Sequence, residues 1–452
     1  MSKERNYGID LLRVVLMYMV CMLHTLGRGG ILGASAAGTR GYKVFYFLEI
    51  LSYCAVDGFA IISGYMANDQ PRKFVKLVDM WFQAFFYSFI VTMILTIVGI
   101  NDSWSKADMI KSAMPVTFGY YWYFTAFFAL YFSIPVLNSF LFSLDSDTAK
   151  KAFIIIVILY SFLGVLGDPF YSNGGYSAIW LMVLYCIGVL AKKIKLFETR
   201  RSITLILLWA LCIVFTWVFH VIIVNGRFTS LISPTILLSG ILMVVLFSRI
   251  RISGSIIQKI SPLTFGIYLF QLNAVIWNIL ENILVGVVNQ PLSVGVPVVF
   301  AFAFALFASG LVVEYIRSRI AKFLGIPAVS KRIVTFLDAM IGKLFVFLKY
   351  RRLMQHRIMG QGDSARDFDT SESMKNVGIL DVFPIFHTAR LGKRSAEACS
   401  SHCAVLPFRP GHDPQGIGIA VPAEPEINNA APRIFGSRLQ SLFSPIDNTG
   451  RF

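Results

Sequence analysis

Long apolar stretches separated by short polar connections fill the first three quarters of the chain. A helix needs about 20 mostly apolar residues to cross about 30 Å of hydrocarbon, and about ten stretches come close to this rule. They are residues 8–26, 44–66, 77–99, 120–142, 152–167, 178–191, 202–224, 232–248, 262–284 and 296–315. The fifth and sixth of them are short. The pattern predicts an all-α fold, a polytopic membrane helix bundle with about ten transmembrane helices.

Composition supports a membrane protein. Apolar residues make up 56% of the 452 residues and charged residues only 15%, against about 25% in soluble globular domains. This balance excludes a disordered chain and argues against a soluble enzyme. The first apolar stretch contains Arg13 and His24 and has no small-residue cleavage site at its end, so we expect no cleavable signal peptide.

The net charge of +16 is distributed unevenly. Alternate connections between the apolar stretches hold eighteen Lys and Arg residues in one set and six in the other. Because basic connections stay on the cytoplasmic side, we expect a multi-pass plasma-membrane protein with both termini in the cytoplasm. No basic patch accompanies a recognisable nucleic-acid-binding fold, so we expect no nucleic-acid partner.

The chain divides into three predicted parts. Residues 1–325 form the membrane domain. Residues 326–349 place basic residues around an apolar stripe, which is typical of an amphipathic helix on the cytoplasmic membrane surface; a solvated helix packed on the bundle is the alternative. Residues 350–452 are rich in Gly, Pro, Ser and Asp and lack periodicity, which is typical of a poorly ordered cytoplasmic tail.

The cysteines and histidines indicate no metal centre. The six cysteines are scattered and form no disulfide framework. Cys399, His402 and Cys403 could supply half of a zinc site, but no second pair with ligand spacing follows them. We therefore expect no bound metal.

The first apolar stretch carries the most informative polar residues. Asp10 lies one turn before Arg13 and can form an ion pair with it. His24 follows Arg13 by eleven positions, which places it within about 20° on the same helix face and about 16 Å further along the axis. Ionisable groups inside a membrane are costly and mark functional sites. The alternative is that Arg13 reaches the inner interface and His24 lies at the outer one.

The second and fourth stretches add further candidates. Asp57 needs a polar partner, and Glu49 lies two turns earlier on a similar face; both acids could simply pair with cations of the bundle. Ser63-Gly64-Tyr65 permits close helix approach, because glycine has no side chain. The aromatic cluster that contains Trp122 and Tyr123 could be an interface belt or a platform on which a sugar stacks.

Taken together, these segments resemble the type-3 membrane acyltransferase family, the bacterial integral-membrane enzymes that O-acetylate envelope glycans. The resemblance covers about residues 5–320. The basic residue, ten-residue gap and histidine form its most diagnostic motif. The matching segments are Tyr7–Arg13 with His24, Val56–Phe59 with Ser63–Tyr65, Tyr121–Phe124 with Pro135, and Thr264–Leu269.

The resemblance implies an O-acyltransferase with a cytoplasmic acyl-CoA donor, acetyl-CoA by analogy, as co-substrate and no bound cofactor. The acceptor would be a hydroxyl of a glycan or lipid-linked sugar at the outer face. His24 matches the essential histidine of the family and Arg13 its paired basic residue. A basic motif of the family corresponds to Arg72, Lys73 and Lys76, although Lys76 stands where an arginine is usual. Gln271 stands where the family often has histidine, and an amide can hydrogen-bond there but cannot transfer a proton.

These residues suggest a mechanism. His24 would activate the acceptor hydroxyl or carry the acyl group itself, because imidazole titrates close to neutral pH. Arg13, together with the basic motif, would bind the phosphates of the donor, and Asp10 would orient Arg13. Tyr65 or Tyr123 would stabilise the oxyanion. Two alternatives stay open, a transporter or exporter and a non-catalytic sensing module; a transporter predicts inverted internal repeats, which the sequence does not show.

Overall fold

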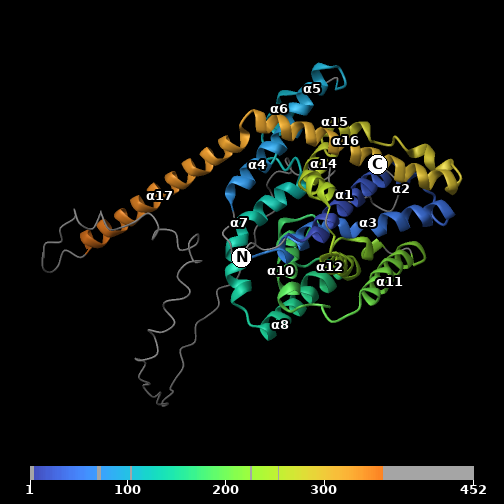
Figure 1. The fold of residues 1–452 in the computed structure, drawn as a ribbon, viewed down its shortest axis with the longest axis horizontal. Coiled ribbons are helices and arrows are strands. Elements are labelled where there is room, and N and C mark those ends of the chain that lie inside the picture. The colour runs from blue at the N-terminus through green and yellow to red at the C-terminus, as the bar shows by residue number, and fades with distance from the viewer. Residues whose placement is uncertain (1–4, 69–72, 102–103, 224–225, 253, 360–452) are drawn as a thin grey trace, which may run out of the picture. The chain divides into compact units, whose positions relative to one another are not determined.

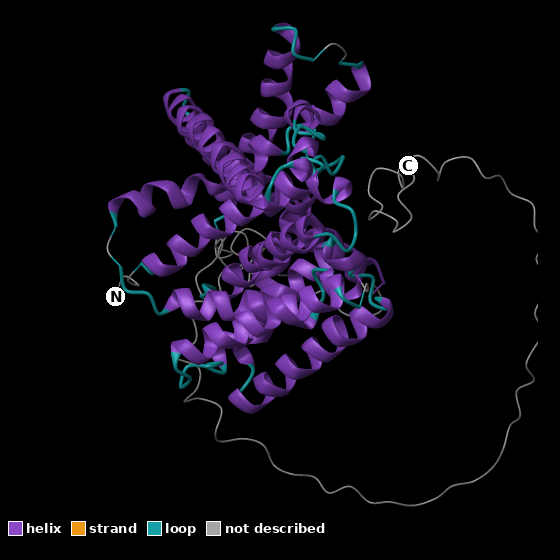
Figure 2. Cartoon of the chain, turned by 90° about the vertical axis from the view of Figure 1, so that its right-hand side faces the viewer, coloured by secondary structure: helices purple, strands orange, loops and turns teal. Residues whose placement is uncertain are grey.

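The computed structural model describes residues 5–68, 73–101, 104–223, 226–252 and 254–359, with side chains described as far as residue 343. Most of the predicted tail therefore lies outside the described residues. Within these ranges the chain forms helices and no strand (Figure 2). Eight helical segments of the described chain are long and apolar enough to cross a membrane. The prediction of an all-α polytopic bundle is thus confirmed.

Figure 1 labels the helices of the bundle and colours them by residue number. Three of them are composite, because a π-helical turn interrupts Phe74–Ile97 and Ser146–Gly167 and a short turn precedes α12 within Gly226–Ser248. The elements are α1 (Tyr7–Gly27), α3 (Arg40–Tyr65), α4 (Phe74–Phe85) with η1 (Phe86–Val91) and α5 (Thr92–Ile97), α7 (Trp122–Ser143), α8 (Ser146–Val157) with η2 (Ile158–Phe162) and α9 (Leu163–Gly167), α11 (Ser202–Val221), η4 (Gly226–Thr229) with α12 (Pro234–Ser248), and α16 (Leu292–Phe323).

Two of the predicted spans are not long continuous helices in the structure. Helix α10 (Ala178–Lys193) has only 16 residues but packs against α3 and α7 in the core. The predicted span 262–284 is broken into η5 (Ser261–Leu263), α14 (Thr264–Gln271) and α15 (Ala274–Ile279). Asn273 causes the break, because its side chain accepts from the backbone N–H groups of Val275 and Ile276 and so caps α15.

The same asparagine ties the break to the π-helical turn of η1. Its Nδ2 donates to the carbonyl of Tyr87 at 2.7 Å and to Thr92 Oγ1 at 2.8 Å. A π-turn alters the regular helical bonding pattern and leaves carbonyls that need partners. The fully buried Asn273 side chain provides the hydrogen-bond partner for the Tyr87 carbonyl. The discontinuity of the ninth segment is therefore stabilised by a residue from another helix.

Shorter helices complete the described chain. They are α2 (Ile31–Ala34), α6 (Lys106–Ala113), η3 (Asn173–Gly175), α13 (Ser255–Ile260), η6 (Val285–Asn289) and α17 (Ile326–Met359). Helix α17 contacts α4 and α16. It continues through residue 349, so the change in composition near residue 350 does not end the helix.

Helix α3 lies at the centre of the bundle, packed against α1, α10 and α12. Close backbone contact requires glycine at both sides of the α3–α10 contact. A Cβ atom at Gly64 would lie 2.0 Å from the carbonyl oxygen of Tyr185, and one at Gly188 would lie 2.3 Å from that of Ile61. The close approach predicted for Ser63-Gly64-Tyr65 is confirmed, and its basis is the small-residue contact common in membrane helices.

We call the end of the bundle where α1 begins the basic end, defined by Arg5, Arg13, Lys193, Arg249 and Lys259. Side-chain contacts join several helix termini there. Asn6 at the start of α1 donates to the carbonyl of Ser248 at the end of α12, and Ser248 Oγ contacts the Tyr65 hydroxyl at the end of α3. Helix α1 therefore begins where α3 and α12 finish.

The glycine contact in α10 gives a test of this packing. Replacing Gly188 with alanine forces a methyl group against the backbone of α3, and overpacking of this kind costs about 1–3 kcal/mol. We expect Gly188→Ala to lower the melting temperature of the detergent-solubilised protein by about 5 °C. Gly342→Ala in α17, where nothing lies within 4 Å of the added atom, is the control. Equal melting temperatures for the two variants would contradict the close contact.

Candidate active site

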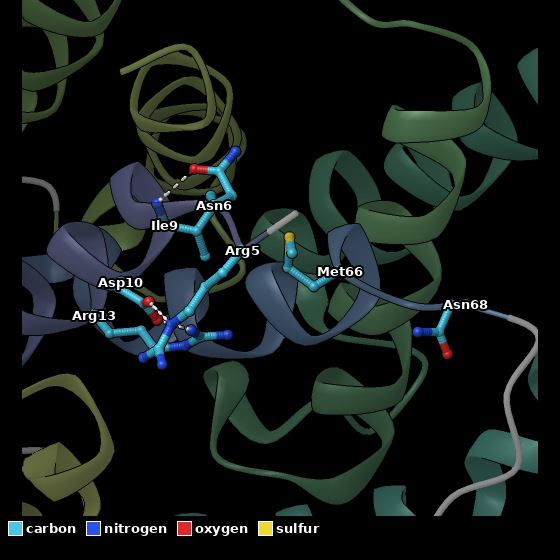
Figure 3. Close-up of a pocket in the computed structure, with 7 residues that line it drawn as sticks. All are labelled: Arg5, Asn6, Ile9, Asp10, Arg13, Met66 and Asn68. Atoms are coloured by element: carbon cyan, nitrogen blue, oxygen red, sulfur yellow. Dashed lines mark hydrogen bonds and ion pairs between the residues drawn. The ribbon is translucent and has the colours of Figure 1, made fainter. Parts of the chain in front are cut away.

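A pocket of about 380 Å³ opens at the basic end, beside the first turn of α1 (Figure 3). The first turn is fixed locally, because Asn6 Oδ1 accepts from the Ile9 N–H at 3.1 Å and caps the helix. Met66 and Asn68 approach the pocket from the end of α3. Its lining residues are Arg5, Asn6, Ile9, Asp10, Arg13, Met66 and Asn68.

Asp10 organises the charges of this pocket. Its carboxylate is buried and binds Arg13 Nη1 at 2.8 Å, Arg5 Nε at 2.5 Å and Ser261 Oγ at 3.1 Å. The predicted pairing of Asp10 with Arg13 is therefore present. The Arg5 and Arg13 side chains stay 47% and 33% exposed, so each guanidinium keeps donors for a ligand. Two cations and one carboxylate leave the pocket with a net positive charge.

Arg5 is a site residue that sequence reasoning missed. It lies just before the N-cap of α1, among the basic residues that indicate membrane orientation. The sequence signal for Arg5 is its spacing of five residues from Asp10. A buried carboxylate has two oxygens and can bind a second arginine besides Arg13. Figure 3 shows the Arg5 and Arg13 guanidiniums converging on the Asp10 carboxylate.

The predicted basic motif is placed only in part. Lys73 and Lys76 begin α4, and both are exposed and do not line the pocket. The carbonyl of Lys73 accepts from the Tyr131 hydroxyl at 2.9 Å, which fixes the start of α4. Arg72 lies outside the described residues.

His24 lies near the opposite end of α1, which runs as one unbroken helix from Tyr7 to Gly27. Its ring meets the edge of Trp277 at 4.9 Å between centroids, and its Nδ1 is buried without a hydrogen-bond partner in the described chain. The side chain of Gln271 interacts with both His24 and Cys21. Gln271 is itself fully buried, and its Oε1 also lacks a partner. The imidazole and the amide thus face each other with unused hydrogen-bonding capacity.

Asp57 and Tyr123 form a second buried polar group. Asp57 Oδ1 accepts from Trp180 Nε1 at 3.0 Å, while Oδ2 has no partner among the described residues. None of the ion pairs found in the described ranges includes Asp57. The Tyr123 hydroxyl, close enough to interact electrostatically with Asp57, is buried and unpartnered as well.

Helix α14 connects these two groups. The backbone N–H of Tyr123 donates to the Tyr268 hydroxyl at 3.3 Å, and the two rings lie 6.1 Å apart. Gln271 follows Tyr268 by one turn of α14. The break after α14 therefore lets one short helix present a phenol beside Tyr123 and an amide beside His24.

The remaining predicted residues lie elsewhere. The Tyr65 hydroxyl contacts Ser248 Oγ at 3.3 Å, and its ring lies 5.5 Å from the Lys192 ammonium, both at the basic end. Ser63 Oγ donates to the Phe59 carbonyl within α3. Trp122 packs 4.7 Å from the ring of Tyr176. The structure thus brings Tyr65 to the level of the pocket and leaves Tyr123 as the tyrosine connected to His24 through α14.

Helix α1 therefore carries two polar groups near its opposite ends. A cationic pocket that suits phosphates and an imidazole with a free nitrogen lie about 16 Å apart on one helix. Residues 6–324 match the family model described as an acyltransferase domain. Since this match covers more than half of the chain, the protein belongs to that family. No curated protein and no solved structure matches the chain.

The Asp10 cluster gives a test of the pocket. Asp10→Asn removes the charge that holds Arg5 and Arg13 together, and two adjacent guanidiniums then repel each other. Loss of one partner from a buried ion pair costs 3–5 kcal/mol, and the partial exposure of both arginines reduces this to about 2 kcal/mol. We expect a lower melting temperature than for Asp147→Asn, which breaks an exposed ion pair with Lys150. Matching melting curves would show that Asp10 does not organise the pocket.

Proposed function

We propose, with membership of the acyltransferase family as the premise, that this protein moves an acetyl group from acetyl-CoA to a hydroxyl of a cell-envelope glycan or lipid-linked sugar. One observation carries the proposal. A single unbroken helix, α1, holds a cationic pocket near one end and, near the other, a buried imidazole with a nitrogen that has no partner in the described chain. This separation suits a donor whose phosphates and reactive thioester are joined by a long arm.

The orientation follows from the charges of the connections. The count of eighteen basic residues against six supports a plasma-membrane protein whose basic end and both termini face the cytoplasm. The donor would then enter from the cytoplasm, and the acceptor from the opposite side.

Donor binding would fall to the two arginines of the pocket. Guanidinium groups bind phosphate through two parallel hydrogen bonds, and Asp10 and Ser261 would hold Arg5 and Arg13 in position. Lys73 and Lys76, together with Arg72 in the same connection, would add positive charge that attracts the donor. About 16 Å along α1 is comparable with an extended pantetheine arm, so the thioester would reach His24.

The transfer step would centre on His24. The imidazole takes the proton of the acceptor hydroxyl, and the oxygen attacks the thioester carbonyl. The tetrahedral intermediate then releases the thiolate of CoA, which takes the proton back from the imidazolium. An acyl-histidine intermediate is the other route open to the same residue. Gln271 Nε2 makes a long contact of 3.8 Å to Met17 Sδ, and the amide interacts with His24. It would stabilise the oxyanion, with Tyr123 and Tyr268 behind it.

The central test is transfer of labelled acetyl from acetyl-CoA to glycan in membranes that contain the full chain. General-base catalysis contributes 10²–10⁴-fold, so we expect His24→Gln to lower the rate at least about 100-fold. Binding of CoA at the basic end should persist, because His24 lies about 16 Å from Arg13 along the helix. An unchanged rate would remove His24 from the reaction, and glycan transport without acyl transfer would favour the exporter alternative.

A second test concerns the donor pocket. Arg5→Gln removes a charged phosphate donor, and a hydrogen bond to a charged group is worth about 1.5–3 kcal/mol. We expect the KM for acetyl-CoA to rise about tenfold with little change in kcat. The control is Arg319→Gln, which removes an exposed arginine that packs on Tyr315. If both variants keep the normal KM, the pocket does not bind the donor.

A further inference from the structure

Trp277 of α15 contacts His24 and Arg28, which stand one helix turn apart at the end of α1. The ring centroids of Trp277 and His24 lie 4.9 Å apart at an interplanar angle of 86°. The guanidinium carbon of Arg28 lies 5.2 Å from the centre of the same indole ring. These geometries are typical of an edge-to-face aromatic pair and of a cation–π contact. One indole ring therefore links the imidazole to Arg28.

Arg28 holds the segment that carries Trp277 through several donors. Its Nε donates to the Trp277 carbonyl at 3.0 Å. Its Nη1 and Nη2 donate to the two carboxylate oxygens of Glu281 at 3.0 and 2.7 Å. A guanidinium fixes its partners well, because its donors form a rigid planar fork. We call Arg28, Trp277 and Glu281 the Arg28 clamp.

Backbone contacts fasten the same segment to the end of α1. The N–H of Asn282 donates to the Arg28 carbonyl at 2.9 Å, and the N–H of Leu284 donates to the Gly29 carbonyl at 2.9 Å. Gly30 follows with a φ of 84°, and a Cβ atom there would lie 2.6 Å from Asn282 Oδ1. This position therefore requires glycine both for its backbone conformation and for space. The chain after α15 is anchored to α1 independently of the Arg28 side chain.

The break in the ninth segment places two side chains against the same imidazole. Gln271 precedes the break at Asn273 and Trp277 follows it, and both interact with His24. Asn273 caps the start of α15, while Arg28 binds the carbonyl of Trp277 within it. Helices α14 and α15 thus contact the imidazole from two separately fixed elements.

His24 lacks the acidic partner that orients many catalytic imidazoles. The ion pairs found in the described ranges do not include His24, and its Nδ1 has no partner there. A catalytic base is usually oriented by a third group. The polar and aromatic neighbours described for this imidazole are the Gln271 amide and the Trp277 ring, so these two side chains are the candidates for that task.

We propose that Trp277 is a positioning residue for His24, and that the Arg28 clamp holds Trp277 in place for the reaction. The proposal rests on the proposed function. The indole restricts the imidazole without hydrogen-bonding to Nδ1, so this nitrogen keeps its capacity to exchange a proton. Loss of the indole should lower kcat rather than weaken donor binding, because the pocket beside Arg13 lies near the other end of α1.

The first arm of the test measures acetyl transfer from acetyl-CoA in membranes that contain the full chain. Misplacement of a catalytic group by about 1 Å can cost about 100-fold in rate. We expect Trp277→Ala to lower kcat by about 10- to 100-fold with an unchanged KM for acetyl-CoA. Trp277→Phe keeps an aromatic ring and should retain most of kcat. Arg28→Lys keeps the charge but loses the planar fork, so kcat should fall again, although less.

The second arm observes the imidazole directly in the full chain labelled at histidine. The NMR signal of the His24 ring is assigned by its loss in His24→Gln. An indole shifts the signals of nearby protons through its ring current, so the His24 signal should move in Trp277→Ala. Trp217→Ala is the matched control for both arms, since Trp217 of α11 meets Phe47 edge-on at 6.1 Å. Melting temperatures are compared for all variants, and Arg28→Lys decides the kinetic arm if Trp277→Ala does not fold.

The two arms separate this proposal from the proposed function. A normal kcat in Trp277→Ala, an equal loss in Trp217→Ala, or a His24 signal that Trp277→Ala leaves in place would each overturn the positioning role. Transfer that requires His24 but not Trp277 would support the acyltransferase function alone. A chain that transfers no acetyl, but whose His24 signal moves in Trp277→Ala, would contradict the proposed function while confirming the contact between the two rings.

Discussion

The cost of placing ionisable side chains in hydrocarbon is the constraint on which the rest of this structure depends. Each such group costs several kcal/mol unless a partner or an aqueous cavity compensates it. Helices α1 and α3 carry Asp10, Arg13, Glu49 and Asp57, and each acid is held differently. Asp10 binds two arginines and a serine, Asp57 binds an indole, and Glu49 interacts with a tyrosine. Within the described chain only the first arrangement supplies cations, whereas Asp57 and Glu49 are held by uncharged donors.

The small residues of α3 make these compensations possible. Gly64 permits direct contact between the backbones of α3 and α10, and this contact aligns Trp180 of α10 with Asp57 two turns earlier on α3. A larger residue would separate the helices and leave a buried carboxylate without its donor, which is more costly than the lost packing alone. Packing and polar satisfaction are therefore coupled through the same pair of helices.

Sequence patterns were sufficient for the features that depend on local spacing. The helical bundle, the Asp10–Arg13 pair and the close approach at Gly64 all follow from periodicity or from the lack of a side chain. The break at Asn273 could not be predicted in this way, because apolar residues continue through it and its partners Tyr87 and Thr92 lie about 180 residues earlier. The separation of Tyr65 from His24 needs the register of α1 against α3, which only a tertiary contact such as Leu16 with Gly58 supplies.

Helix α14 shows why an irregular element suits the centre of such a site. A continuous spanning helix would bury a single stripe against its neighbours, whereas α14 is held from two sides. Glu314, which binds Arg317 and the Tyr87 hydroxyl, packs directly against Gly266 at one end, and Asn273 fixes the other end to η1. Both anchors involve Tyr87 of η1, so η1, α14 and α16 define one position for Gln271. The Gln271 amide is therefore held beside His24 by a rigid element, and the chain changes direction after it. This support preorganises the amide and the imidazole without a charged partner in the membrane.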